Sequence, residues 1–169
     1  MLIAIPAALT LAACTNGAER ASGATDQRPS ASSDTSSAAD GRDLELQESN
    51  RALVLDFYNT FFNDHDTEAA AKVVADDYRQ HNPEVPDGKG PFVSFFTGFF
   101  AENPDSRAEI VRSAADGDLV YLHVHSTNGA DDLGSAVVDI FRVEDGMIVE
   151  HWDVIQDVPA TSANENTMF

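Results

Sequence analysis

The sequence predicts an α+β domain in which N-terminal helices pack on one face of a curved antiparallel sheet. From residue 43 to Glu102, apolar residues recur at steps of three and four, which is the spacing of amphipathic helices. After Asn103-Pro104 the spacing changes to two, which is the spacing of strands. Asp-Gly pairs at 116–117 and 145–146 then separate the predicted strands. Helices followed by a strand meander are typical of this fold class.

The first thirteen residues form an apolar run that ends just before Cys14. The run is too short to span a bilayer comfortably and is typical of a signal-peptide core. The segment Leu-Ala-Ala-Cys at 11–14 resembles the bacterial lipobox, which implies cleavage before Cys14 and acylation of that cysteine. The alternative is an ordinary N-terminal helix with a buried cysteine. We expect residues 14–42, rich in Ser, Ala, Thr and Gly, to form a disordered tether.

This reading places the protein outside the cytoplasm, lipid-anchored to a bacterial membrane on the periplasmic side or at the cell surface. The formal net charge of −19 argues against nucleic acid, whose phosphates require Lys and Arg, and against docking on anionic lipid. It is instead typical of a soluble acidic surface. Cys14 is the single cysteine, so neither an internal disulfide nor a cysteine metal cluster can form.

The predicted helices lie in the first half of the domain, which spans residues 43–159. Apolar spacing predicts a first helix over 44–63 and a second over about 67–76. The polar stretch YRQHNP at 78–83 is expected to be irregular, because a proline ends it. A third helix, over about 91–102, begins at a proline and carries five phenylalanines.

The predicted strands follow without an intervening helix. Alternating side chains indicate strands at 107–115, 118–126, 135–144 and 147–157. Residues 160–169 carry no such pattern and are expected to be a flexible tail.

The last hairpin organises the predicted site. Asp145-Gly146 predicts a two-residue type I′ turn, because both positions must tolerate a positive φ. Asp139 would then lie opposite Trp152, on a mostly apolar face. That face is expected to hold Val137, Asp139, Phe141, Val143, Ile148, Glu150, Trp152 and Val154. A one-residue bulge would swap the faces of one strand, and this alternative stays open.

A carboxylate on an apolar face is the main candidate for chemistry. If the 118–126 and 135–144 strands pair around the Ala130–Asp132 loop, His123 lies opposite or next to Asp139, and His125 shares the face of His123. We therefore interpret Asp139, His123 and His125 as candidate catalytic residues. The candidate substrate contacts are Tyr78, His81, Asn82, Phe141 and Trp152.

Such a group suits general acid/base catalysis. A carboxylate in an apolar environment loses hydration, which makes it a stronger base. It could take a proton from a carbon next to a carbonyl, while a His or Tyr donor holds the developing enolate oxygen. This chemistry requires no cofactor, and the expected ligand is a small apolar carbonyl compound.

Structural explanations compete with this interpretation. Asp139 could form an ion pair with Arg142, His123 or His151, and the histidines of the 118–126 strand could face solvent. Three histidines and an aspartate could also bind a metal, but their spacing matches no compact ligand motif, so we expect no metal site.

The element order, with YRQHNP after the second helix and DIFRVEDGMIVEHWDVIQ at the end, resembles the SnoaL-like branch of the nuclear transport factor 2-like superfamily. More narrowly, it is similar to bacterial proteins described as predicted SnoaL-like aldol-condensation enzymes. The resemblance covers about 44–159. It implies a cystatin-like cone that often forms a homodimer through its sheet.

For the polyketide cyclases of this group, the resemblance implies cofactor-free aldol chemistry with an aspartate as acid/base. That position corresponds to Asp139, and its partner would be a histidine of the preceding strand. The resulting hypothesis is an enzyme with a hydrophobic pocket and aldol-type, isomerase or lyase activity. The alternatives are a non-catalytic module of the same fold that binds a small molecule, and a module that pairs through its sheet.

Overall fold

The computed structural model describes residues 43–169. The predicted signal peptide, Cys14 and the tether up to residue 42 lie outside the described residues. Within the described part of the chain, we find no helix that combines the length and the apolar character needed to cross a bilayer.

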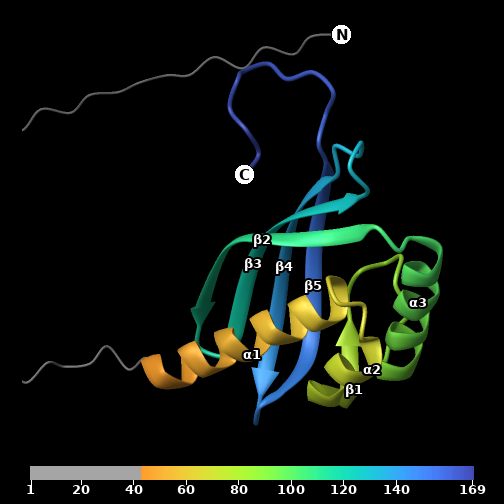
Figure 1. The fold of residues 1–169 in the computed structure, drawn as a ribbon. Coiled ribbons are helices and arrows are strands. Elements are labelled where there is room, and N and C mark those ends of the chain that lie inside the picture. Colours follow the sequence, from red (N-terminus) through yellow and green to blue (C-terminus); the bar gives the residue numbers. More distant parts are fainter. Residues whose placement is uncertain (1–42) are drawn as a thin grey trace, which may run out of the picture. The chain divides into compact units, whose positions relative to one another are not determined.

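The described residues form an α+β domain, as predicted. The helical elements are α1 (Leu44–Phe62), α2 (Thr67–Ala70), the 3-10 helix η1 (Ala71–Val73) and α3 (Lys89–Glu102). The strands are β1 (Val74–Gln80), β2 (Ser106–Asp116), β3 (Leu119–Asn128), β4 (Ser135–Glu144) and β5 (Met147–Asp157). They form one sheet in the order β1-β5-β4-β3-β2. Figure 1 shows α1 crossing one face of this curved sheet.

Helix α1 begins and ends close to the predicted positions. The side chain of Asp43 accepts a hydrogen bond of 2.9 Å from the backbone N–H of Leu46, which satisfies one of the free donors at the helix start. The helix buries Val54, Phe57 and Phe61 toward the sheet and α3. Its amphipathic pattern therefore identified both its length and its inner face.

The segment after α1 differs from the prediction. The second helix was expected to continue to residue 76, but α2 ends at Ala70 and a single 3-10 turn follows. The YRQHNP segment was expected to be irregular, but its first residues belong to β1, which pairs in parallel with β5. β1 lies at the sheet edge, and its sequence VADDYRQ has little apolar alternation. The pairing with β5, rather than local propensity, defines this strand.

The β4–β5 hairpin has the predicted turn but a different register. Asp145 and Gly146 have φ values of 51° and 75°, as a type I′ turn requires. Val143 pairs with Ile148, whereas Arg142 pairs with Glu150, so Val149 is an extra residue in β5. This bulge moves His151 to the face that was predicted for Glu150 and Trp152. The predicted face was right up to Ile148 and wrong beyond it.

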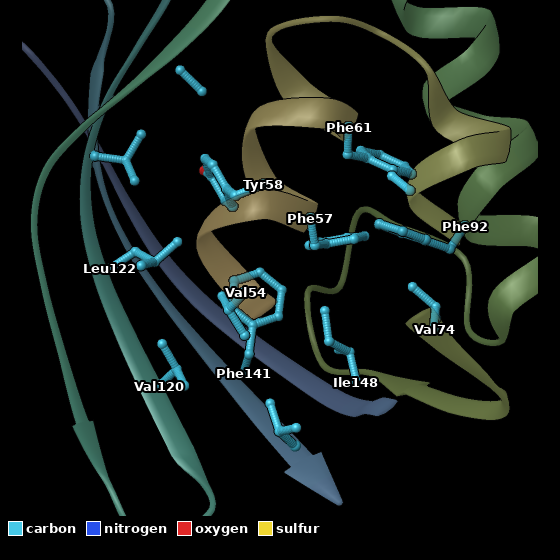
Figure 2. Packing of buried hydrophobic residues seen from close by; sticks show 14 of the residues in the cluster. Val54, Phe57, Tyr58, Phe61, Val74, Phe92, Val120, Leu122, Phe141 and Ile148 are labelled. Atoms are coloured by element: carbon cyan, nitrogen blue, oxygen red, sulfur yellow. The ribbon is translucent and has the colours of Figure 1, made fainter. Parts of the chain in front are cut away.

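The core lies between the sheet and the helices. Figure 2 shows Phe57 and Phe61 projecting from α1, with Val120 and Leu122 on one side and Phe92 on the other. Phe61 is fully buried, and its ring stacks on that of Phe92 with centroids 4.8 Å apart. Aromatic packing thus joins α1 to α3.

Residues 160–169 contain no helix or strand, in line with the prediction of a tail without regular structure. The tail is not free of the domain, however. The ring of Phe169 stacks on His125 with centroids 4.1 Å apart, and it also lies over His123. The C-terminus therefore returns to the outer face of the sheet.

We expect Phe61→Ala to lower the free energy of unfolding by about 3–5 kcal/mol, because it removes a fully buried ring and leaves a cavity between α1 and α3. Urea unfolding measures this change. Phe95→Ala is the matched control, since Phe95 is 40% exposed and should cost much less. Equal losses for the two variants would contradict this account of the core.

Candidate active site

Asp139 is a buried carboxylate with two partners on the inner face of the sheet. The Tyr58 hydroxyl of α1 donates to its Oδ2 at 2.8 Å, and His151 Nε2 of β5 lies 2.9 Å from its Oδ1. Asp139 and His151 are 4% and 6% exposed. Each oxygen of the buried carboxyl group thus has a polar partner, which offsets the cost of burying it.

The other ring nitrogen of His151 is also engaged. Its Nδ1 lies 3.0 Å from Oε1 of Gln80, the residue opposite it on the parallel strand β1. The imidazole also stacks on Phe141, with centroids 4.5 Å apart. These contacts hold the ring in one orientation against Asp139.

A second aspartate lies beside the pair. Asp153 is directly opposite Asp139 across the β4–β5 ladder, so both side chains point to the same face. The side-chain amide of Asn82 donates to Asp153 Oδ2 at 2.7 Å. The segment after β1 therefore holds this second carboxylate in place.

These polar groups line a cavity of about 270 Å³. Phenylalanine rings from α1 and α3 also line it, namely Phe62, Phe92, Phe95, Phe96, Phe99 and Phe100. Glu84 and Phe95 are exposed and also line the cavity, so it opens to solvent beside them. An apolar cavity with a few convergent polar groups is the usual form of a small-molecule site.

The two tyrosines of the cavity remain protonated. Burial raises the pKa of the Tyr58 phenol well above its usual value, and the Asp139 charge raises it further. Burial likewise raises the pKa of Tyr78, with additional contributions from Asp139 and Asp153. Both phenols therefore keep their proton near neutral pH, and Tyr58 donates its proton to Asp139.

Asp139, His151 and Asp153 each bring one potential ligand atom within 4.8 Å of the others. That grouping has the geometry to hold a metal ion and differs from the three-histidine combination that the sequence suggested. Its two buried members, however, already contact each other, and Tyr58 occupies the second oxygen of Asp139. The observed contacts are those of an acid/base pair.

The structure brings only part of the predicted site together. Tyr78, Asn82 and Phe141 line the cavity beside Asp139, as expected for substrate contacts. The contact predicted for His123 or His125 with Asp139 is wrong, because Leu122 is the residue opposite Asp139.

Both histidines of β3 point to the outer face of the sheet. His123 Nδ1 lies 2.8 Å from an Arg112 guanidinium nitrogen, and His125 Nε2 lies 2.9 Å from the Leu133 carbonyl oxygen. The predicted strands were right, but the register across the β3–β4 loop is shifted by one residue from the expected one. In a sheet, one residue of shift moves a side chain to the other face.

His81 and Trp152 also lie away from the cavity, contrary to the prediction. Their rings stack on each other with centroids 4.8 Å apart. His81 Nε2 contacts Glu150 at 2.9 Å, and Glu150 also accepts from Arg79 and Arg142. These residues form a charged cluster on the outer face of the sheet.

Sequence reasoning missed His151, Asp153 and Tyr58 as members of the site. His151 was named only as a possible ion-pair partner of Asp139, and that contact is present. The bulge at Val149 was the signal that could have identified both β5 residues. Tyr58 follows Val54 by four residues on the buried face of α1, but no pattern in the sequence joins it to Asp139.

Comparisons with known proteins agree with this fold. A family model described as a SnoaL-like domain matches residues 54–151. No curated protein matches the sequence at a significant level. Many solved structures match the fold, and three of them are described next.

A protein from Kribbella flavida named a putative ketosteroid isomerase is similar with a TM-score of 0.58 and 24% identity, over 73% of this chain and 89% of that one. A Bacillus cereus protein named a putative polyketide cyclase has a TM-score of 0.54 and 22% identity, over 63% and 74%. A cystatin-fold protein from Novosphingobium aromaticivorans has a TM-score of 0.55 and 23% identity, over 62% of this chain and 97% of that one. At these identities the likeness supports the shared fold.

The charged cluster around Glu150 should make the stability of the domain depend on pH. The hydrogen bond from His81, followed by that from Arg142, lowers the pKa of Glu150 below its ordinary value of 4.5. Its contribution to stability is therefore present above pH 4.5 and is lost as the pH falls through the folded-state pKa. We expect Glu150→Gln to lower the free energy of unfolding by about 1 kcal/mol at pH 7. The loss should become smaller as the pH falls below 4.5 and Glu150 of the wild type takes up a proton.

Urea unfolding of both proteins between pH 7 and pH 3 measures this difference. Glu144→Gln, at the exposed end of β4, is the matched control and should have little effect at any pH. A difference for Glu150→Gln that does not change with pH would contradict the assignment.

Proposed function

This chain belongs to the SnoaL-like domain family, and from that membership and the buried Asp139–His151 pair we propose that it catalyses cofactor-independent acid/base chemistry on a small apolar carbonyl compound. The reaction class is aldol-type, isomerase or lyase. The observation that carries the proposal is a buried carboxylate, paired with an imidazole, in the lining of a cavity that is otherwise mainly apolar.

The proposed step is proton abstraction next to the carbonyl group. The C–H bond of the substrate breaks, its electron pair forms the enolate, and the proton moves to an Asp139 oxygen. His151 holds the carboxylate in place through its contact with Oδ1. Returning the proton to another carbon gives isomerisation. Attack of the enolate on a second carbonyl instead forms a C–C bond and an alkoxide, which takes the proton from Asp139 to give the aldol product.

The size and lining of the cavity support an apolar substrate. A volume of about 270 Å³ suits a molecule of one or two rings, and seven phenylalanines offer flat apolar surface. Asp139, Asp153 and Glu84 line it together with no Lys or Arg, which disfavours a substrate that carries a carboxylate or phosphate near these residues. Substrate selection would therefore rest on shape and apolar contact.

We expect Asp139→Asn to reduce the rate of proton abstraction by about 10²- to 10⁴-fold while ligand affinity changes little, because the amide keeps the shape but cannot accept the proton. Incorporation of deuterium from D₂O next to the carbonyl, followed by NMR over a panel of cyclic ketones and β-keto esters, measures this step directly.

Asp145→Asn is the matched control, because it makes the same chemical change in an exposed turn and keeps a residue that tolerates positive φ. If wild-type protein binds members of the panel but exchanges none of their hydrogens, the second candidate function holds. That function is a non-catalytic module that uses the same aromatic cavity to bind a small molecule.

A separate observation favours assembly through the sheet. Val138 and Val154 pair across β4 and β5 on the outer face and are 42% and 68% exposed. We propose that this face forms the contact of a homodimer, since exposed apolar side chains on a sheet face are typical of an interface. The lipid anchor at Cys14, with its extracytoplasmic location, likewise remains a proposal from the sequence.

We expect Val154→Asp to convert a dimer to a monomer in light scattering, because a dimer would bury the new charge. Leu46→Asp, on the exposed side of α1, is the control and should leave the mass unchanged. A wild-type protein that is monomeric at high micromolar concentration would contradict the dimer.

A further inference from the structure

Gln80 lies behind the acid/base pair, on the edge strand β1, and contacts three of its neighbours. Its Oε1 lies 2.9 Å from the backbone nitrogen of Asn82 and 3.0 Å from His151 Nδ1. Its side-chain nitrogen lies 3.2 Å from the hydroxyl of Tyr78. A backbone N–H can only donate, so the contact with Asn82 requires the oxygen of the amide on that side. The orientation of the Gln80 amide is therefore determined.

This orientation decides the tautomer of His151. Because Gln80 Oε1 can only accept, His151 Nδ1 must carry a hydrogen and donate it. The remaining nitrogen, Nε2, faces the Asp139 oxygen at 2.9 Å. A single proton between these two atoms then joins the imidazole to the carboxylate.

The same orientation decides the direction of the Tyr78 hydroxyl. The Gln80 amide nitrogen donates to the Tyr78 oxygen, so the phenol proton must point elsewhere. Within residues 43–169, the Tyr78 hydroxyl makes no second hydrogen bond, and Tyr78 lines the cavity. The phenol also stays protonated, because burial raises its pKa.

We propose that Gln80 is the positioning residue that sets the direction of the hydrogen bonds in this site. It fixes the Nδ1–H form of His151 on one side, and on the other side it makes Tyr78 the hydrogen-bond donor to the carbonyl oxygen of the ligand. The inference rests on the proposed function for the identity of the ligand, but the hydrogen-bond directions themselves are independent of catalysis.

This arrangement gives each end of the reacting group its own partner. Asp139 takes the proton from carbon, and the charge that develops on the carbonyl oxygen meets the Tyr78 hydroxyl. Gln80 is paired with His151 in the register of β1 and β5, so the backbone ladder holds it in place. The single amide of Gln80 thus sets the hydrogen bonds of both His151, which contacts the base, and Tyr78, the donor.

Two substitutions separate the two effects. Gln80→Glu keeps an acceptor for His151 Nδ1 and Asn82 but replaces the donor toward Tyr78 with a second acceptor. The Tyr78 hydroxyl would then donate to the new carboxylate and leave the cavity without its donor. Gln80→Met removes both functions. Gln156→Glu makes the same change of charge at an exposed position of β5 and is the control.

The first measurement is the tautomer of His151, read from long-range proton–nitrogen NMR correlations in ¹⁵N-labelled protein, with His151→Gln used for assignment. We expect a protonated Nδ1 in the wild type, in Gln80→Glu and in Gln156→Glu, and loss of its protected proton in Gln80→Met. A wild-type His151 with an unprotonated Nδ1 would overturn the proposal.

The second measurement is the infrared carbonyl stretch of ¹³C-labelled acetophenone, which falls in frequency when the oxygen accepts a hydrogen bond. We expect a lowered frequency in the wild type and in Gln156→Glu. In Gln80→Glu and in Tyr78→Phe we expect the carbonyl frequency to rise again by the same amount. The affinity of each variant for acetophenone should fall about tenfold. The variant that combines Gln80→Glu with Tyr78→Phe should lose no more affinity and no more frequency shift than either single variant.

Retention of the infrared shift in Gln80→Glu, or no binding of acetophenone by the wild type, would overturn the donor role of Tyr78. Failure of the proposed function has a different signature. There, deuterium exchange would be absent while the tautomer and the carbonyl shift appear as expected, and Gln80 would then position the polar groups of a binding pocket.

Discussion

The extra residue Val149 in β5 is the constraint on which the site depends. Without it, Glu150 and Trp152 would lie on the inner face beside Asp139, and His151 would point away. With it, the imidazole reaches the carboxylate at 2.9 Å, and a cross-strand aspartate joins them. Bulges are common next to active sites because they re-aim side chains at the cost of a single unpaired residue. Here the bulge comes soon after the tight turn, where the ladder is still short.

The same bulge divides the charged residues of the last strand between two environments. Glu150 faces outward, where its carboxylate is shared by Arg79, Arg142 and His81 near the surface. Inward, the polar groups are few, and each has a partner: among residues 43–169, no buried side-chain nitrogen or oxygen lacks a hydrogen bond. These hydrogen bonds matter for stability because an unpaired polar group in an apolar core lowers the free energy of unfolding. They also hold the groups of the cavity in one orientation.

Strand β1 and the residues after it hold two polar side chains of β5 in place. Its parallel pairing with β5 places Gln80 opposite His151, and the residues that follow carry Asn82 to Asp153. On the helical side, α1 supplies Tyr58 to Asp139, and the rings of α3 close the cavity. The cavity thus takes one wall from the sheet and the other from helices distant in sequence. A site built on such packed elements is more rigid than one built on loops alone.

Periodicity and turn chemistry are local properties, so the fold class, helix α1, four of the five strands, the type I′ turn and the inward Asp139 could all be predicted from the residues alone. They did not determine β1, whose pattern is weak and whose pairing partner lies some seventy residues away. They also did not determine which histidine meets Asp139, since one residue of register exchanges His123 for Leu122 on β3, and one bulge exchanges Trp152 for His151 on β5. Register depends on how the strands pack together in three dimensions, so the composition of the site follows from the folded domain and not from any local pattern.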